Sequence, residues 1–486
     1  KKDELTLRYK LNWDFNETTD INFLISKVDL DDPADIWTID GSLNTLSDRP
    51  GMDSQETDSY GIKITKNFDN FDIQSFTSIT KTDVIFSYDA DWGNSESHFP
   101  YTYDYFSKTL RNRDTFSQEV RFLSKNKDLT EQDKLQWIFG IDISELEEKN
   151  ITRDDGIYGD PSDQYSPYVS ESIVSRNYEA ENLSLFGNID YFLSENHKLA
   201  FGLRWENWDS KYNDSNQESF NPSDNMNGGK ISLIKNNDNS NIYFSIARGY
   251  KQGGFNLGLD ATDNSIKDSL IYEPEFLTNY EIGLSSNSNN PILNYSAVFF
   301  FSEREDQQVL ISRQVDPTDP NTFSYLTQNA AEGENYGLEI SSNYFVRDNL
   351  NLYANFGLLK TKIKNWESRS DLKNRAQAHA PERNFSLGAN LSFMNNFYLK
   401  MDINGKSSFF YSDSHNNKSK NYQLVNITLG YKKLNLSTDI WIRNLFDEYY
   451  STRGFFFGNE APNFVDTLYK RQGDPKNIGI SVRYDF

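Results

Sequence analysis

The sequence predicts an all-β protein, a transmembrane antiparallel up-and-down β-barrel with short periplasmic turns and long extracellular loops. Three observations predict this fold: a two-residue alternation of apolar and polar side chains, connections that alternate in length, and a low mean hydropathy combined with many aromatic residues. A strand with one apolar face and one polar face is the unit from which such a barrel is built.

The alternation is clearest in the last ten residues, 477–486. One face of this segment is apolar or aromatic throughout, and the other carries small, polar or charged residues. The apolar face is formed by Ile478, Ile480, Val482, Tyr484 and Phe486. A final strand that ends in Phe is typical of bacterial outer-membrane barrels.

The same alternation recurs at residues 199–206, 279–285, 336–341 and 434–443, where charged residues stand between apolar ones. In a soluble sandwich the apolar face points inward, whereas in a wide barrel it points to lipid and the charged face lines a polar lumen. The lumen residues predicted on this basis are Glu119, Arg121, Arg204, Glu206, Glu281, Glu339 and Arg443.

The composition fits a barrel of this kind. The chain has 49 Lys and Arg against 72 Asp and Glu, a net charge of −23, and its mean hydropathy is −0.73. Only half of each short strand must be apolar, so no run of about 18 apolar residues is needed. The aromatic content of 15% suits two interfacial girdles. The absence of Cys excludes disulfides and thiolate chemistry, and the acidity argues against a nucleic-acid partner.

Connections between the predicted strands alternate between short and long. Short ones are predicted at residues 16–20, 67–70, 194–197, 236–241, 287–291, 347–349, 395–396 and 432–433, and long ones at 29–56, 93–113, 154–170, 257–271 and 454–474. Barrels of the outer membrane have short periplasmic turns and long external loops, so this asymmetry orients the chain.

The strands number roughly nineteen. An odd number is unexpected, because bacterial single-chain barrels have an even number. We therefore expect the chain to begin inside a barrel, with two sheet edges that lack a neighbouring strand, at residues 5–15 and 477–486.

Several strings resemble one family. In chain order they are SQEVRF (117–122), IARGYKQGGFN (246–256), EPEFLTNYEIGLS (273–285), NAAEGENYGLE (329–339), RNLFDEYY (443–450) and the closing SVRYDF. Together they resemble the barrel domain of TonB-dependent outer-membrane receptors. Over residues 1–112 the resemblance depends mainly on the strand pattern.

The resemblance implies a barrel of about 22 strands, an N-terminal plug and a segment that contacts TonB. Residues 1–486 then correspond to a single, partial barrel domain without the plug and the TonB box. The resemblance also implies a Gram-negative outer membrane with its lipid and lipopolysaccharide, the inner-membrane TonB complex as a partner, and energised import of a scarce solute. Iron chelates such as ferric siderophores are the leading class of solute.

No catalytic or metal site is predicted. The four His residues, at 98, 197, 379 and 415, lack ligand spacing, and no nucleophile elbow occurs. Acidic clusters such as Asp29, Asp31, Asp32 and Asp35 could bind calcium but lack a twelve-residue calcium loop. The chain is therefore expected to be no enzyme and to need no cofactor.

Ligand contacts are expected in the external loops. Aromatic residues crowd two of them, and rigid aromatics at a barrel mouth can enclose a planar or hydrophobic solute. The candidates in these loops are Trp92, His98, Tyr101, Tyr103, Tyr105, Phe455, Phe456 and Phe457. The alternative is that most of them form the girdle or pack loop on loop, with one or two touching the ligand.

A second group of candidates lies where the IARGYKQGGFN strand leaves the membrane. Arg248, Tyr250, Lys251 and Phe255 stand beside the Gly253–Gly254 pair, which permits a bend. Cationic groups there suit an anionic iron chelate, and the alternative is that they pair with nearby acids. The lumen charges likewise either contact a plug or pair across neighbouring strands.

Two other functions remain open for the sequence. A passive channel or porin needs no plug and no energy, and a structural or adhesive surface barrel needs only the long loops. Within the importer hypothesis, vitamins, haem and oligosaccharides remain alternatives to iron chelates.

Overall fold

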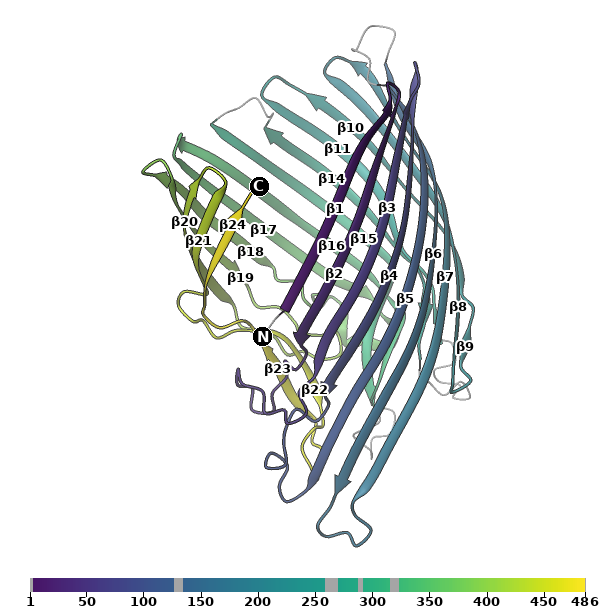
Figure 1. Cartoon of the computed structure of the whole chain (residues 1–486), viewed down its shortest axis with the longest axis vertical. Coiled ribbons are helices and arrows are strands. Elements are labelled where there is room, and N and C mark those ends of the chain that lie inside the picture. The colour runs from purple at the N-terminus through teal and green to yellow at the C-terminus, as the bar shows by residue number, and fades with distance from the viewer. Residues whose placement is uncertain (1–2, 126–133, 258–269, 287–291, 315–322, 486) are drawn as a thin grey trace.

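One curved antiparallel sheet forms the wall of a barrel in the computed structural model of the chain (Figure 1). The structure describes residues 3–125, 134–257, 270–286, 292–314 and 323–485. Within them the main sheet has twenty strands, of which β9 (Ser219–Phe220) is a two-residue pairing in a loop. Nineteen long strands remain, so the count predicted from the sequence is confirmed for the described part of the chain.

The long strands cover most of the described chain. They are β1 (Asp3–Asn16), β2 (Thr19–Pro33), β3 (Met52–Asn67), β4 (Phe71–Asp89), β5 (Thr102–Ser124), β6 (Leu135–Gly159), β7 (Tyr168–Ser194), β8 (His197–Asp214), β10 (Ser223–Asn236), β11 (Ser240–Lys251), β14 (Glu275–Ser286), β15 (Leu293–Gln314), β16 (Phe323–Arg347), β17 (Leu350–Asn365), β18 (Arg383–Phe393), β19 (Phe397–Lys406), β20 (Tyr422–Lys433), β21 (Leu436–Arg443) and β24 (Asn477–Tyr484).

Smaller elements lie in the loops at one end of the barrel. They are the pairs β12 (Gly254–Phe255) with β13 (Ile271–Tyr272) and β22 (Ser451–Phe457) with β23 (Thr467–Gln472), and the 3₁₀ helix η2 (Glu367–Leu372). No helix in the described ranges has the length and apolar character that crossing a membrane requires.

Each long strand pairs antiparallel with the next long strand along the chain, which confirms the up-and-down topology. β1 pairs with β2 and β24 pairs with β21, and the described residues form no ladder between β1 and β24. The two edges predicted at residues 5–15 and 477–486 are therefore the two edges of the sheet (Figure 1).

Tight turns join the strands at one end of the wall, for example at residues 17–18 between β1 and β2 and at 434–435 between β20 and β21. Long loops join them at the other end (Figure 1). The asymmetry predicted from the sequence is thus confirmed. The short connection predicted at 287–291, and most of the long one at 257–271, lie outside the described residues.

The loop ends differ from the prediction in detail. Residues predicted as loop at 102–113, 154–159 and 168–170 belong to strands β5, β6 and β7. β7 has 27 residues, far beyond the about 9–11 that cross a bilayer. The ladder continues past the membrane, where the apolar alternation used for the prediction ends. Two further long loops, at 366–382 and 407–421, were not predicted.

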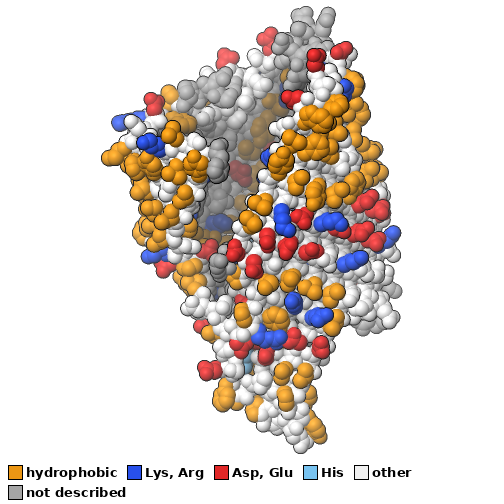
Figure 2. All heavy atoms as spheres, viewed as in Figure 1, with side chains coloured by type: hydrophobic (Ala, Val, Ile, Leu, Met, Phe, Trp, Pro, Cys, Tyr) orange, Lys and Arg blue, Asp and Glu red, His pale blue; other side chains and the backbone are white. Residues whose placement is uncertain are grey.

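The faces of the strands follow the predicted orientation. Leu203, Ile282 and Val482 have 57%, 54% and 67% of their surface exposed on the wall, whereas the Arg204 side chain is 38% exposed. Figure 2 shows apolar side chains spread over the outer surface of the wall on the turn side, and a belt of charged side chains nearer the loops. An apolar outer band is what the hydrocarbon layer requires.

The loops after β2, β4 and β21 are joined by a buried polar cluster, which we call the loop knot. Asp35, Ser47, Asp89, Asp91 and Asn459 form it. The Asp89 backbone N–H donates to Asp35 Oδ1 at 3.0 Å and Ser47 Oγ donates to Asp89 Oδ2 at 2.6 Å. Asn459 Nδ2 donates to the carbonyl oxygen of Asp91 at 2.6 Å. Segments 368 residues apart are therefore fixed against each other at the mouth.

Within the loop knot, the pKa values of Asp89 and Asp91 shift in opposite directions. Burial raises the pKa of Asp89 to about 6, the Asp91 charge adds to this increase, and the hydrogen bond from Ser47 opposes it. Burial also opposes ionisation of Asp91, but hydrogen bonds from His98 and from the backbone of Tyr105 and Gly93 lower its pKa. Between about pH 4 and pH 6 the folded loop knot therefore holds a protonated Asp89 beside an ionised Asp91.

The outward face can be tested at neighbouring positions of β16. Ile340→Arg puts a charge on the lipid-facing side, where it costs about 2–4 kcal/mol near the bilayer midplane. Ser341→Arg, on the lumen side of the same strand, is the matched control and is expected to cost less than about 1 kcal/mol. Urea unfolding of the protein in phospholipid vesicles measures both, and equal losses would contradict the assigned faces.

The loop knot predicts a pH dependence that Asp89→Asn removes. A folded-state pKa of about 6 against an ordinary value of 3.8 means that the folded state binds the extra proton. Stability of the loop knot therefore falls as the pH rises from about 4 to about 6, and the loss persists above pH 6. Asp89→Asn should raise the unfolding temperature at about pH 7.5 and leave it unchanged near pH 4.

Tryptophan fluorescence of the protein follows this transition, because Trp37 and Trp92 lie in the same loops. Asp48→Asn, an exposed carboxylate of the first loop, is the control and should leave the pH profile as it is. If Asp89→Asn kept the wild-type pH profile, the assignment of the proton to Asp89 would be wrong.

Candidate ligand site at the loop end of the barrel

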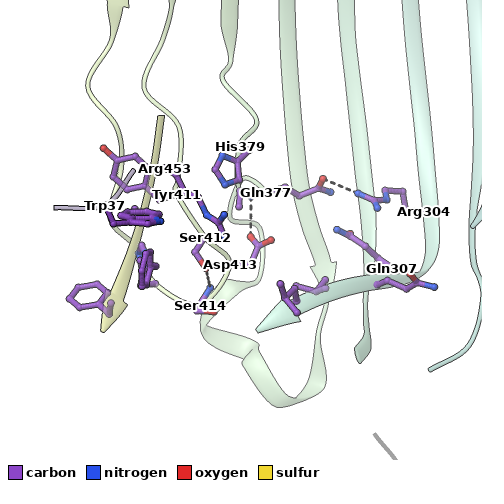
Figure 3. A pocket seen from close by; sticks show the side chains of 18 residues that line it. Trp37, Arg304, Gln307, Gln377, His379, Tyr411, Ser412, Asp413, Ser414 and Arg453 are labelled. Atoms are coloured by element: carbon purple, nitrogen blue, oxygen red, sulfur yellow. Dashed lines mark hydrogen bonds between the residues drawn. The ribbon is translucent and has the colours of Figure 1, made fainter. Parts of the chain in front are cut away.

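A cavity of about 650 Å³ opens at the loop end of the barrel. Its lining comes from five parts of the chain: the loop after β2, strand β15, the loop after β17, the loop after β19 and strand β22. Figure 3 shows the side chains that line it. Loops that are far apart in sequence are thus brought around one space.

Aromatic rings form one side of this cavity. Trp37 from the first loop meets Phe455 of β22 edge to face, with ring centroids 4.6 Å apart. Phe456 meets the His415 ring at 5.0 Å, and Tyr411 completes this side. Edge contacts of this kind stabilise aromatic pairs and leave ring faces available for a solute.

Polar groups form the opposite side. Arg304 of β15 is paired with Glu275 of β14, its Nε 2.6 Å from Glu275 Oε1. In Figure 3 the Gln377 side chain points toward Arg304, whose Nη1 is 3.4 Å from Gln377 Oε1. Gln307 and Gln377 are only 4% and 7% exposed. Gln307 Oε1 and Gln377 Nε2 are buried and find no hydrogen-bond partner within the described ranges.

A third side is built on Asp413. Its Oδ1 accepts a hydrogen bond from the Ala378 backbone at 3.0 Å and from Arg375 Nη2 at 3.2 Å. Arg375 also donates to the carbonyl oxygens of Ser412, at 2.6 Å, and His415, at 3.0 Å. These bonds hold the loop at 407–421 against the loop at 366–382, so Arg375 has a structural role here.

The ionisable groups of the cavity are mostly neutral or paired. Burial lowers the pKa of His415, and burial together with the Arg453 charge lowers the pKa of His379. Burial raises the pKa of Asp413, although the Arg375 charge opposes this. Both imidazoles are therefore uncharged near neutral pH and can donate or accept hydrogen bonds. Arg453 is exposed and forms no ion pair with any described residue.

Two of the predicted aromatic candidates, Phe455 and Phe456, line this cavity. Phe457 and Trp92 instead pack together beside it, with ring centroids 5.7 Å apart, and Tyr469 meets Trp92 at 5.0 Å. Trp92 has a positive φ of 60°, and its ring is held in this cluster by contacts with Phe457 and Tyr469. The sequence placed these rings in one region, and the fold divides them between the cavity and its support.

The candidates in the second loop are packed inside it. His98 is 5% exposed with Nε2 3.6 Å from Asp91 Oδ1, and Tyr103 is 9% exposed against the His98 ring. The Tyr105 backbone N–H donates to Asp91 Oδ2 at 2.8 Å, and the Tyr101 N–H to the His98 carbonyl at 2.9 Å. This arrangement is the loop-on-loop packing that the sequence left open as the alternative.

The candidates at residues 248–255 are separated by the fold. Phe255 stacks on Phe220, with centroids 5.0 Å apart, and Tyr250 donates to Glu206 Oε2 at 2.9 Å. Lys251 is exposed at the end of β11. Arg248 shares the face of Phe244 and Ile246, which is the outer face of the wall, because Ser245 and Ala247 are on the lumen side. The fold therefore does not bring these four candidates together in one place, and a role for any of them in binding a solute stays a prediction.

The lumen candidates lie on the inner face. Glu119 and Arg121 form an ion pair, and Arg204 Nε donates to Glu206 Oε2 at 2.9 Å. Glu281 accepts from Asn279 at 2.7 Å and from Tyr243 at 3.2 Å. Arg443 lies over the Trp441 ring at 5.8 Å, and Glu339 is exposed. Most of these residues therefore contact neighbouring side chains on the wall. This is one of the two interpretations that the sequence left open.

Sequence reasoning missed most of the cavity. Trp37, Arg304, Gln307, Gln377, His379, Asp413, His415 and Arg453 were not singled out as ligand contacts. They come from five segments without a shared motif, so no local signal joins them. Among the described residues, no group of three or more His, Cys, Asp or Glu is arranged to hold a metal ion.

Comparisons with known proteins agree with this architecture. The pesticin receptor of Yersinia pestis is 21% identical over 427 residues, which cover 84% of this chain and 57% of the receptor. A probable TonB-dependent siderophore receptor, PiuA of Acinetobacter baumannii, is 26% identical over 198 residues, which cover 39% of this chain and 25% of PiuA. The chain thus spans little more than half the length of the pesticin receptor.

Solved structures share the fold. The ferric yersiniabactin uptake receptor FyuA of Yersinia pestis superposes with a TM-score of 0.77 at 16% identity, over all of this chain and 71% of FyuA. The siderophore receptor PiuA of Acinetobacter baumannii gives a TM-score of 0.75 at 16% identity, over 99% of this chain and 74% of PiuA.

The sequence model of the family described as "TonB dependent receptor-like, beta-barrel" matches residues 3–445. This family consists of receptors and transporters in the outer membrane of Gram-negative bacteria. The match extends over more than half of the chain and runs from β1 to the end of β21. The chain therefore belongs to the TonB-dependent receptor-like β-barrel family.

Proposed function

We propose that this chain is the barrel portion of an outer-membrane receptor that binds an iron chelate at the loop end and imports it with energy from the inner-membrane TonB complex. The single observation that carries this proposal is the cavity of about 650 Å³ at the mouth of a TonB-type barrel. The names of the relatives, a siderophore receptor and a ferric yersiniabactin uptake receptor, support iron chelates as the ligand class.

The lining of the cavity suits a ligand of this class. Ring edges and faces of Trp37, Phe455 and Phe456 can contact planar parts of a chelate. Arg453 supplies positive charge, while Gln377 and the two uncharged imidazoles supply hydrogen bonds to oxygen atoms. Aromatic rings beside an exposed cation suit a partly aromatic anion.

The rest of the receptor enters the proposal through the relatives. This chain spans 57% of the pesticin receptor, and the remainder is proposed to supply a plug and a TonB box. The lumen charges Glu119, Arg121, Arg204, Glu206, Glu281, Glu339 and Arg443 are proposed to be available to contact that plug. We further infer that the protein is no enzyme, since the cavity residues serve recognition.

Uptake by living cells tests this function. Cells that carry the full-length receptor are given radiolabelled ferric citrate, a ferric catecholate or a ferric phenolate chelate. We expect saturable uptake of at least one chelate that stops when TonB is deleted or the proton-motive force is collapsed. Uptake that continues without TonB, or that rises linearly with concentration, would instead indicate a passive channel.

Two substitutions test the ligand cavity. Arg453→Gln removes the unpaired cation and Phe456→Ala removes a ring, and each is expected to weaken binding of the imported chelate about tenfold. Lys420→Gln removes a cation from the loop at 407–421 without touching the lining, and should bind as the wild type does. Trp92→Ala should lower the thermal stability of the loops more than it lowers affinity, because Trp92 is packed beside the cavity. Tryptophan fluorescence titration measures the affinities, and wild-type affinity in both cavity variants would place the ligand elsewhere.

A further inference from the structure

A groove of about 710 Å³ runs along the outer face of β6, β7, β8, β10 and β11. Its walls are apolar, formed by Phe139, Leu185, Phe201, Leu203, Trp205, Ile231 and Ile246. All of these residues share the outward face of their strands, as the registers show. The groove therefore opens toward the membrane and is separate from the ligand cavity at the mouth.

Two outward-facing glycines explain why the wall is hollow here. Gly187 and Gly229 lie on both sides of Leu203 in neighbouring strands. A Cβ on Gly187 would come within 2.7 Å of the Phe139 ring, and one on Gly229 within 2.9 Å of Leu203 Cδ2. Because the two glycines have no side chains, the Phe139 ring and the Leu203 side chain lie low against the strands and form the floor of a depression between rows of exposed aliphatic residues.

The groove has a direction. Ile231 lies at the turn end of its part of β10 and Asn227 lies four residues nearer the loops, which makes the groove about 13 Å long. Trp205 stands at the same level as Asn227. An indole in this position is typical of the membrane interface. The loop end of the groove is thus at the headgroup level of the outer leaflet.

A cation closes this loop end. The Arg248 guanidinium lies 4.0 Å from the centre of the Phe276 ring, and its Nη1 donates to Asn227 Oδ1 at 2.7 Å. Both contacts position the group without neutralising it. No carboxylate of a described residue pairs with Arg248, whereas Arg204, on the other face of the wall, is paired with Glu206. An uncompensated cation at the interface favours an anion beside it.

We propose that this groove binds lipid A, with an acyl chain along the apolar walls and a phosphate on Arg248. The occupant is assigned from charge and position. The apolar walls favour hydrocarbon, and Arg248 at the loop end favours an anion. That end lies on the extracellular side, where phosphorylated lipid A forms the outer leaflet. On the outer face of β7, β8 and β10, the carboxylates nearest to the groove are Glu181 and Asp209, which lie closer to the loops than the paired Asn207 and Asn225. This inference depends on the outer-membrane location but not on which solute is imported.

Binding of purified lipid tests the proposal. The full-length receptor is delipidated in mild detergent and titrated with bisphosphorylated lipid A, and native mass spectrometry counts the bound molecules. We expect one tightly held lipid A per wild-type receptor. Arg248→Gln should weaken binding about tenfold, Arg248→Lys less, and Leu203→Ser several-fold through loss of apolar contact.

Controls separate a specific site from general attraction. Lys211→Gln removes a cation from the outer face of β8, where Glu179 lies opposite it, and should bind lipid A as the wild type does. Equal thermal unfolding of the lipid-free variants shows that all are folded. Wild-type affinity in Arg248→Gln, or equally tight binding of phosphatidylglycerol, would overturn the lipid A site. Failure of the import proposal is recognised independently, because it shows in the chelate uptake of cells and not in lipid binding.

Discussion

Lipid hydrocarbon offers no hydrogen bonds, so every backbone N–H and C=O group inside the bilayer must be bonded within the protein. The rest of this structure depends on that requirement. In hydrocarbon each unpaired group costs several kcal/mol, so a strand can cross only as a member of a ladder. The nineteen long strands meet this requirement by pairing each with its neighbour along the chain. The same requirement makes the side chains two-faced, since one side of the ladder meets lipid and the other a wet interior. A net charge of −23 is compatible with a membrane protein only because of this division.

Beyond the bilayer the constraint is relaxed, and other interactions hold the chain. β5, β6 and β7 continue as a ladder far past the apolar band, with charged side chains on both faces. The loops above are held by buried polar contacts, in the loop knot around Asp35 and Asp89 and in the bonds of Arg375 to Asp413 and to carbonyl oxygens. Buried polar groups stabilise a loop most when they are satisfied, and the buried atoms that find no partner among the described residues include two cavity amides, on Gln307 and Gln377. Those amides lie where a solute could satisfy them.

The sequence predicted the strands and the direction of their side chains, but little of the arrangement of the loops. The final strand and the outward direction of Leu203 and Ile282 follow from a two-residue alternation that can be seen in each segment alone. The number of strands follows from counting such segments between the connections. The outward direction of Arg248 could also have been predicted, because it continues the alternation of Phe244 and Ile246. The motif around it instead favoured a place among the ligand candidates at the mouth of the barrel. By contrast, Arg304, His379 and His415 meet only because two separate loops fold against strand β15 around one space. No periodicity in the chain encodes that meeting.

The arginines show how a single residue type acquires different roles from its surroundings. Arg304 and Arg375 are largely compensated by Glu275 and Asp413, so their charge orders the loops and contributes little net attraction. Arg453 and Arg248 have no such partner among the described residues and face an aqueous mouth and a lipid groove, respectively. In a chain with 72 acidic residues the long-range field repels anions, and only such local, uncompensated cations can reverse it at short range. Binding of an anion at either place therefore depends on one charge that no described carboxylate neutralises, and at Arg248 this charge is held in position by the Phe276 ring and by Asn227.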